Sequence, residues 1–208
     1  SKLEGRVGMI AIINYGLGNL HSVQKALSFV GSEVVVTDDP QTILEAEKII
    51  LPGVGAFAIG MEGLESRGLV SVIREVAATR KPLLGICLGM QLLFKESEEK
   101  GQHRGLGLLP GKVVLFQQPK LKVPQIGWNQ IEVVKDSKLM KGIQDSDYVY
   151  FNHGYYCLPE DVEDWLTMTE YGLNFASSVE RENLYGVQFH PEKSQKVGLQ
   201  ILKNFVEL

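Results

Sequence analysis

The chain has 208 residues, of which 44% are hydrophobic and 22% charged, and its formal net charge is −4. This balance is typical of a globular domain, and the small negative charge argues against a general binding surface for nucleic acid or membrane lipid. No apolar run approaches the roughly 20 residues that a membrane-spanning helix needs, and we find no signal peptide.

Residues 1–8 do not resemble the start of a fold, because the first apolar run begins at Met9. We expect this segment to be an expression remnant or a disordered N-terminus. Residues 9–208 contain no internal repeat, low-complexity tract or Pro/Ser-rich linker. We therefore predict that residues 9–208 form a single domain.

Short apolar runs alternate with helical patterns in the first half of the chain. The predicted strands cover 9–13, 34–37, 48–51 and 83–86, the predicted helices cover 20–30, 57–64, 69–78 and 88–94, and a turn is predicted at 38–40. Strands and helices that alternate at this spacing predict right-handed crossovers and a parallel sheet. The working site of such a sheet lies at the carboxyl ends of its strands, where the turns 14–19 and 52–55 and Cys87 fall.

Cys87 stands where a buried strand meets a helix, with Gly85 and Gly89 two residues away on either side. This pattern predicts a nucleophile elbow in which cysteine replaces serine. The glycines remove side chains that would clash at a strained corner, and the helix N-terminus favours a thiolate. Most free cysteines are small buried apolar residues, so the pattern alone leaves that interpretation open. Cys157 is expected to be such a residue, and two cysteines far apart favour a reducing cytoplasm over a disulfide framework.

Shorter strands follow in the second half. They are predicted at 112–116, 130–134, 148–151, 166–169, 175–179 and 185–189, before a last helix at 193–206. Some of these strands form hairpins. The predicted fold is therefore α/β, with an open, mostly parallel central sheet flanked by helices and additional antiparallel strands in the C-terminal half.

His190 follows the last predicted strand, and Glu192 comes two residues later. A nucleophilic thiol needs a base, and the base needs a group that orients it. Glu192 is close enough to accept a hydrogen bond from one nitrogen of His190. The spacing does not show that His190 reaches Cys87, because a histidine after a strand is more often a surface or capping residue.

Several segments together resemble the class I (triad-type) glutamine amidotransferases. The segment 85–91 is similar to the nucleophile segment of that family, and 189–192 to its His–Glu segment. Within the family, the chain is most similar to glutaminase subunits of imidazole glycerol phosphate synthases from histidine biosynthesis. That finer resemblance is carried by 14–20, 51–57, 127–129 and 190–194.

The resemblance implies a Cys-His-Glu triad that hydrolyses L-glutamine to glutamate and ammonia through a cysteinyl thioester. Cys87 attacks the side-chain amide, His190 moves the proton, and Glu192 orients the imidazole. The oxyanion hole would consist of the backbone N–H groups of Leu88 and Val54. A flip of the peptide after Gly53 would switch this hole on or off.

The resemblance also implies the residues that bind glutamine. They are Gly55, Gln91, Glu99, Gly154 and Tyr155. Glu99 would recognise the substrate amino group, and the backbone at Gly154 and Tyr155 its carboxylate. Gly154 departs from the serine or threonine expected there, which would weaken glutamine binding only if a hydroxyl takes part.

The implied partner is a cyclase subunit with a (β/α)8-barrel fold, bound as a heterodimer. It would receive ammonia and convert a phosphoribosyl-formimino-carboxamide nucleotide (PRFAR) to imidazole glycerol phosphate and aminoimidazole carboxamide ribotide. The interface residues implied by the resemblance are Asn14, Trp128, Tyr150 and Lys193. No cofactor is expected, and no metal site, because no His and Cys pair has ligand spacing.

Three alternatives remain at this point. The chain could be the amidotransferase subunit of another biosynthetic pathway, a standalone γ-glutamyl thiol hydrolase, or a non-catalytic subunit that kept the fold. The turn 14–20 and the ending Lys193-Ser194 favour the histidine pathway. The intact Cys87, His190 and Glu192 argue against a non-catalytic subunit.

Overall fold

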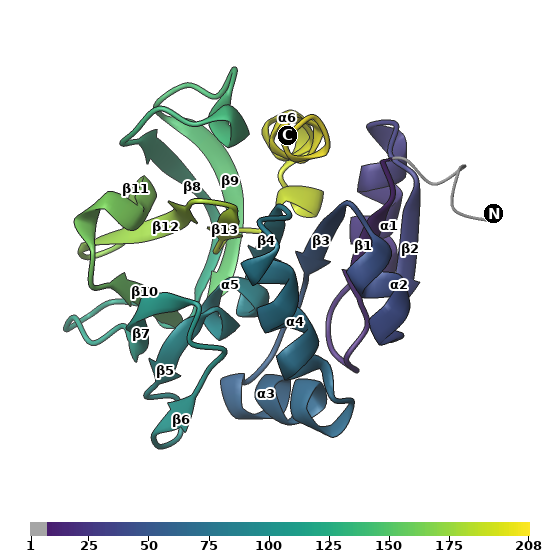
Figure 1. Ribbon diagram of the computed structural model, residues 1–208. Coiled ribbons are helices and arrows are strands. Elements are labelled where there is room, and N and C mark those ends of the chain that lie inside the picture. Colours follow the sequence, from purple (N-terminus) through teal and green to yellow (C-terminus); the bar gives the residue numbers. More distant parts are fainter. Residues whose placement is uncertain (1–7) are drawn as a thin grey trace.

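A nine-stranded sheet runs through the computed structural model, which describes residues 8–208 (Figure 1). Its strand order is β2-β1-β3-β4-β13-β12-β11-β8-β9. The strands are β1 (Ile10–Ile13), β2 (Val34–Thr37), β3 (Lys48–Leu51), β4 (Leu83–Ile86), β8 (Gln125–Val133), β9 (Asp147–His153), β11 (Trp165–Glu170), β12 (Asn174–Arg181) and β13 (Leu184–Val187). Apart from Gly8, the N-terminal segment predicted to be a remnant lies outside the described residues.

The first five strands of that order, from β2 to β13, pair in parallel, as the alternating pattern predicts. Because side chains alternate across a strand, the sheet has a core on each face. Ile10 and Ile12 of β1 join the core beneath α1 (Leu20–Phe29) and α6 (Gln195–Val206). Ala11 and Ile13 join the opposite core, beneath α2 (Pro40–Glu45), α3 (Phe57–Ser66) and α4 (Leu69–Ala78).

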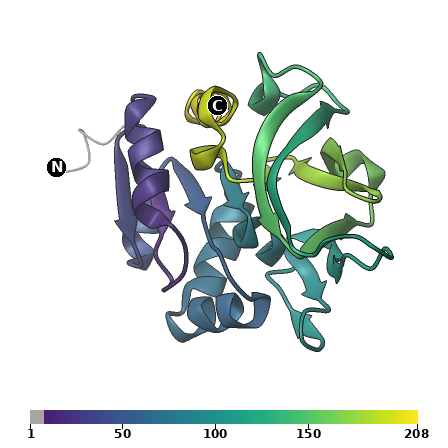
Figure 2. The same ribbon diagram turned by 180° about the vertical axis from the view of Figure 1, so that it is seen from behind.

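The remaining four strands, β12, β11, β8 and β9, continue the sheet with antiparallel pairing and curl strongly (Figure 2). A second, four-stranded sheet has the order β10-β7-β5-β6. Its strands are β10 (Tyr155–Pro159), β7 (Leu109–Leu115), β5 (Phe94–Ser97) and β6 (His103–Arg104). The predicted α/β class, with a parallel core and antiparallel additions in the C-terminal half, is confirmed.

Two local predictions were wrong. The helix after Cys87, α5, covers only Leu88–Leu92, and Phe94 starts strand β5 by pairing with Leu109. The predicted turn at 38–40 instead opens α2. Asp39 caps that helix by accepting a hydrogen bond from the Thr42 N–H, and Pro40 occupies the first turn, where no backbone donor is needed.

Short 3₁₀ helices complete the fold, at Lys138–Met140, Val162–Asp164 and Pro191–Lys193. Within residues 8–208, no helix has both the length and the apolar character that crossing a bilayer requires.

Candidate active site

Cys87 occupies a strained corner between β4 and α5. Its backbone angles are φ 54° and ψ −113°, a conformation that residues other than glycine rarely adopt. A Cβ on Gly89 would lie 1.8 Å from the Leu51 carbonyl oxygen, and one on Gly85 would lie 2.6 Å from the Gly89 oxygen. The predicted elbow geometry and the need for both glycines are therefore confirmed.

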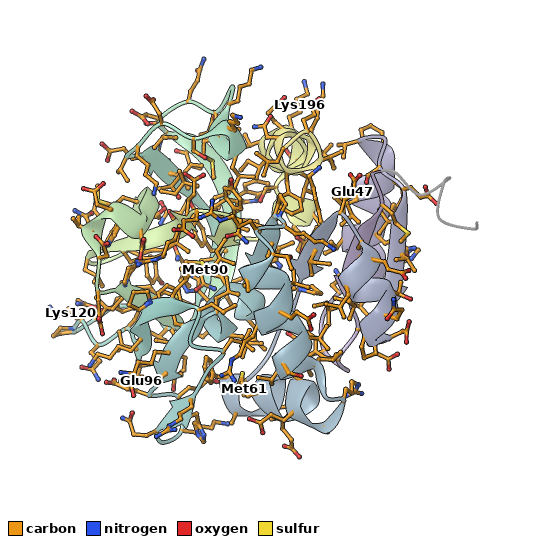
Figure 3. The ribbon with its side chains drawn as sticks, in the orientation of Figure 1. Glu47, Met61, Met90, Glu96, Lys120 and Lys196 are labelled. Atoms are coloured by element: carbon orange, nitrogen blue, oxygen red, sulfur yellow. The ribbon has the colours of Figure 1, made fainter. Side chains whose placement is uncertain are left out.

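Helix α5 is anchored on the centre of the sheet by Met90. This side chain is fully buried and packs over Gly186 of β13, where an added Cβ would come within 2.6 Å of it (Figure 3). The contact fixes the start of α5 above β13 as well as β4. The nucleophile corner and the segment after β13 are thereby held together.

His190 reaches the same edge of the sheet as Cys87 because β13 pairs in parallel with β4. Val187 lies opposite Ile86, so the two chains leave the sheet together although a hundred residues separate them. The Nδ1 atom of His190 lies 2.7 Å from Oε1 of Glu192, and both side chains are almost fully buried. The register of two strands thus explains a proximity that sequence spacing left open.

The pKa of His190 is set by opposing effects. Burial lowers it, but hydrogen bonds to Cys87 and Glu192 and the negative charges of these two groups raise the pKa of His190 to about 10. Protonated His190 is therefore favoured while it lies between a thiolate and a carboxylate. Such a pair is the form in which a cysteine acts as a nucleophile.

Two further groups contact the sulfur. The Cys87 thiol lies 4.0 Å from the carbonyl oxygen of Asn152, and Nε2 of Gln188 lies 3.7 Å from Sγ. Neither residue was predicted from the sequence. Gln188 carried one usable signal: it lies at the end of the predicted strand 185–189, two positions before His190, where an extended chain would place both side chains on the same face.

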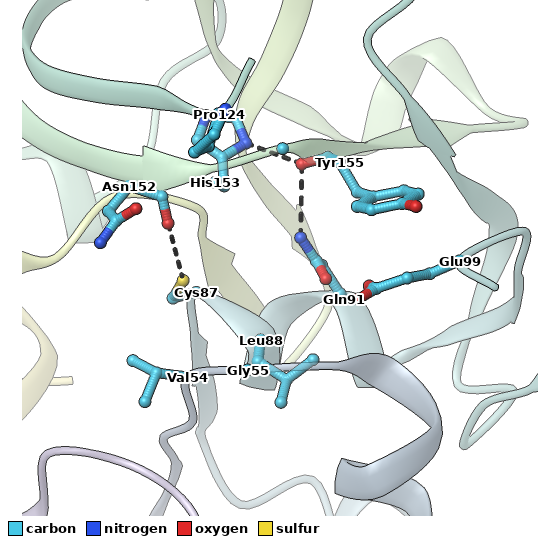
Figure 4. Close-up of a pocket in the computed structure, with 11 residues that line it drawn as sticks. Val54, Gly55, Cys87, Leu88, Gln91, Glu99, Pro124, Asn152, His153 and Tyr155 are labelled. Atoms are coloured by element: carbon cyan, nitrogen blue, oxygen red, sulfur yellow. Dashed lines mark hydrogen bonds between the residues drawn. The ribbon is translucent and has the colours of Figure 1, made fainter.

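A cavity of about 280 Å³ opens above Cys87 (Figure 4). It is lined by Val54, Gly55, Cys87, Leu88, Gln91, Glu99, Pro124, Asn152, His153, Gly154 and Tyr155. All five residues predicted to bind glutamine are among them. A space of this size lies near the lower end of small-molecule sites and suits a ligand as small as an amino acid.

Gln91 and Glu99 give the cavity its hydrogen-bond acceptors. Nε2 of Gln91 donates to the Tyr155 carbonyl at 3.4 Å and to Oε1 of Gln188 at 3.1 Å. Both of its hydrogens are used, so the group that Gln91 keeps for a ligand is its own carbonyl oxygen. Burial raises the pKa of Glu99, whose carboxyl lines the same cavity. Together these acceptors fit an ammonium group.

The two predicted oxyanion donors do not face one site in this structure. The Leu88 N–H donates to the Gly53 carbonyl at 3.1 Å. In a trans peptide the N–H points opposite to the C=O, so the Val54 N–H is directed away from Leu88. Tyr15 braces the same turn by donating from its hydroxyl to the Pro52 carbonyl at 2.5 Å.

Three of the four predicted interface residues gather beside His190. Trp128 and Tyr150 are paired across β8 and β9, with ring centroids 6.0 Å apart. Nζ of Lys193 lies 5.9 Å from the centre of the Tyr150 ring, which lies 6.4 Å from the His190 ring. Asn14 follows β1, where its side chain accepts a hydrogen bond from the Gly16 N–H, and no described contact joins it to these three.

Comparison with known proteins identifies the family. The sequence profile described as "Glutamine amidotransferase class-I" matches residues 11–208. The "Imidazole glycerol phosphate synthase subunit HisH" of Moorella thermoacetica is 56% identical, covering 96% of this chain and 94% of the relative. The protein of the same name from Aquifex aeolicus is 53% identical, covering 93% of this chain and 94% of the relative.

Solved structures show the same fold. The structure of PurLQS from Thermotoga maritima superposes with a TM-score of 0.74 at 21% identity, covering 96% of this chain and 97% of that one. A crystal structure described as a glutamine amidotransferase also gives a TM-score of 0.74, at 17% identity, covering 95% and 99%. The profile match and the close relatives together show that this chain belongs to the class I glutamine amidotransferase family.

Proposed function

We propose that this chain is the glutaminase subunit of an imidazole glycerol phosphate synthase. It hydrolyses L-glutamine to glutamate and ammonia and passes the ammonia to a cyclase subunit. The observation that carries the proposal is the buried imidazole of His190, hydrogen-bonded to Glu192 at the sheet edge where Cys87 lines an amino-acid-sized cavity. The relatives that share about half of its sequence carry the same subunit name.

The reaction follows from these three side chains. The Cys87 thiolate attacks the side-chain amide carbon of glutamine, and a tetrahedral oxyanion forms. Protonated His190 gives its proton to the amide nitrogen, so ammonia leaves and a γ-glutamyl thioester remains. His190 then takes a proton from water as the water attacks the thioester, and glutamate is released. Glu192 holds the imidazole and stabilises its positive charge throughout.

Substrate recognition uses the groups that line the cavity. The carbonyl oxygen of Gln91 and the carboxylate of Glu99 accept hydrogen bonds from the α-ammonium group of glutamine. The backbone at Gly154 and Tyr155 binds its α-carboxylate, and Gly55 borders the site. Since the Gly154 backbone does this work, the absence of a hydroxyl there is tolerated.

The oxyanion hole forms when the peptide between Gly53 and Val54 rotates. Rotation releases the Leu88 N–H from the Gly53 carbonyl and turns the Val54 N–H toward the substrate. One such donor is worth about 3–4 kcal/mol in the transition state. The chain alone is therefore a weak glutaminase, and binding of the cyclase favours the rotated peptide.

The partner is a (β/α)8-barrel cyclase that forms a heterodimer with this chain in the cytoplasm. Trp128, Tyr150 and Lys193 contribute the anchoring surface, and Asn14 contacts the partner from the end of β1. The cyclase uses the ammonia to convert PRFAR to imidazole glycerol phosphate and aminoimidazole carboxamide ribotide. Cys87 and Cys157 are both free and buried, which suits a reducing compartment.

Replacing the nucleophile tests the proposal. In the complex with the cyclase, Cys87→Ala should abolish glutamine-dependent product formation, while added ammonium salt should still support the cyclase. Cys157→Ala is the matched control and should keep glutamine-dependent turnover. Glutamine-dependent turnover by Cys87→Ala would refute the assignment. High activity of the isolated chain on γ-glutamyl peptides would instead indicate a standalone hydrolase.

A further inference from the structure

Gln188 is a buried polar residue that the mechanism above does not use. It follows β13 directly, two positions before His190, and its side chain has no solvent exposure. Its backbone N–H donates to the Ser177 carbonyl at 2.9 Å, which fixes the chain at this point. An amide buried so completely is costly unless its polar atoms are hydrogen-bonded.

Both ends of the Gln188 side chain contact the proposed active site. Oε1 accepts a hydrogen bond from Nε2 of Gln91 at 3.1 Å, and Nε2 donates to Cys87 Sγ at 3.7 Å. The first bond decides the orientation of the amide, since its oxygen must face Gln91 and its nitrogen must then face the sulfur. Gln91 is oriented in turn by the Tyr155 carbonyl.

We propose that Gln188 is a further residue of the active site, with two tasks that its amide performs at once. It donates a hydrogen bond to the Cys87 thiolate, and it holds Gln91 with the carbonyl oxygen of Gln91 free for the substrate ammonium group. The inference rests on the proposed glutaminase function and deepens it. Gln188 thereby connects the nucleophile to the substrate-binding residue.

The chemistry favours this arrangement. A hydrogen bond to an ionised acceptor is stronger than one to a neutral acceptor, so the Gln188 N–H stabilises the thiolate more than the thiol. The His190 imidazolium also stabilises the thiolate, but it must give its proton to the leaving ammonia. Gln188 keeps its hydrogen throughout and stays a donor to the sulfur.

The test measures alkylation of Cys87 by iodoacetamide in the chain without its partner, followed by mass spectrometry of the Cys87 peptide. Gln188→Met replaces the amide with an apolar side chain of similar volume. The rate at pH 7 should fall about tenfold relative to wild type, as expected for the loss of one hydrogen bond to a charged group. The plateau rate at high pH, where the thiol is ionised in both proteins, should stay the same.

A second variant and a control guard against a simple folding defect. Gln188→Asn keeps an amide, but its side chain is too short to join Gln91 and Cys87. The alkylation ratio, which is the rate at pH 7 divided by the plateau rate at high pH, should therefore fall in this variant as well. Ser177→Ala alters the neighbouring buried residue without touching the sulfur and should leave the ratio unchanged. A wild-type ratio in both Gln188 variants would overturn the proposal.

Steady-state kinetics of the complex separate the second task from the first. Both Gln188 variants should raise KM for glutamine in addition to lowering kcat, because Gln91 loses its brace. An unchanged KM would overturn the positioning of Gln91.

If the wild-type complex fails to hydrolyse glutamine while the alkylation ratio still falls in the Gln188 variants, the proposed function fails and the contact with sulfur stands. If the complex hydrolyses glutamine and the ratio is unmoved, only the role of Gln188 fails.

Discussion

His190 is one residue whose charge ties stability to pH. Its folded-state pKa of about 10 lies above the ordinary value of 6.5, because Cys87 and Glu192 outweigh the effect of burial. A raised pKa means that the folded state holds the proton more tightly than the unfolded chain. This stabilisation is complete below pH 6.5 and disappears as the pH rises through 10.

Glu192→Gln should therefore destabilise the chain most near pH 6. The variant removes one of the two groups that raise the pKa of His190, so the difference in unfolding free energy from wild type should shrink by about 1–2 kcal/mol between pH 6 and pH 10. Urea denaturation of both proteins at pH 6 and at pH 10 measures this difference in unfolding free energy. Glu47→Gln, at an exposed carboxylate, is the control whose difference should not change with pH. A constant difference for Glu192→Gln would contradict the argument.

At the residue scale, the sequence predicted the groups that belong to recognisable segments and missed those that depend on neighbours. Cys87, His190 and Glu192 lie in such segments, and the glycines around Cys87 indicated the strained corner. Asn152 was not predicted, because it contacts the sulfur through its carbonyl oxygen, which every residue carries. The only sequence signal for Gln188 was its place two positions before His190, and that signal could not indicate its contacts with Gln91 and Cys87.

At the scale of elements, the turn 52–55 is braced by Tyr15. A Cβ on Gly53 would lie 2.1 Å from the Tyr15 hydroxyl oxygen, the same oxygen that donates to the Pro52 carbonyl. Tyr15 and the positive φ of Gly53, 156°, therefore both favour glycine at position 53. The same contact connects the turn after β1 to the peptide that would rotate to form the oxyanion hole.

A double-mutant cycle tests this brace. Gly53→Ala alone should lower the unfolding free energy by about 1–3 kcal/mol, the usual cost of overpacking. Tyr15→Phe removes the clashing oxygen, and the next atom of that ring lies 3.3 Å away, so the double variant should lose less than the sum of the single variants. Urea denaturation of the four proteins gives the coupling. Additive losses would show that Tyr15 does not restrict position 53.

The elements that the sequence predicted best are those fixed by burial alone. The strands 48–51 and 83–86 are buried along their whole length and match the structure at both ends. The helix 69–78 also matches, because its buried residues follow the helical period. The edge strand 34–37 matches as well, although it is only half-buried. Helix α2 was missed because six residues are too few to show a period. Phe94 was assigned to a helix because it continues the spacing of Leu88 and Leu92, whereas pairing with Leu109 makes it a strand residue.

At the scale of the whole molecule, the site lies where the parallel half of the sheet meets the antiparallel half. Strand β13 makes that junction, since it pairs in parallel with β4 and antiparallel with β12. The parallel half supplies Cys87 and the turn 52–55, while β9, β10 and the residue between them supply Asn152, Gly154 and Tyr155. A small displacement of one half relative to the other would therefore alter the cavity. The cyclase would act on this junction by binding beside β8 and β9.

Trp128 provides the test of that binding surface. It is 47% exposed, stands on β8 next to Tyr150, and is the largest apolar side chain near His190 that remains open to a partner. Trp128→Ala should weaken the complex with the cyclase by about 2 kcal/mol, roughly 30-fold in Kd, as for an aromatic residue at the centre of an interface.

Phe29 is the matched control, because it is 77% exposed but belongs to α1, on the opposite side of the molecule from β8 in both views (Figures 1 and 2). Phe29→Ala should leave Kd unchanged in an isothermal titration with the cyclase. If the cyclase contacted the α1 and α6 face instead, the ranking would reverse, and Trp128→Ala would bind like wild type. Equal losses in both variants would point to a change in folding, which the thermal unfolding midpoints of the free chains would reveal. Only a loss confined to Trp128→Ala agrees with an interface centred on β8 and β9, where the Tyr150 ring lies between Trp128 and His190.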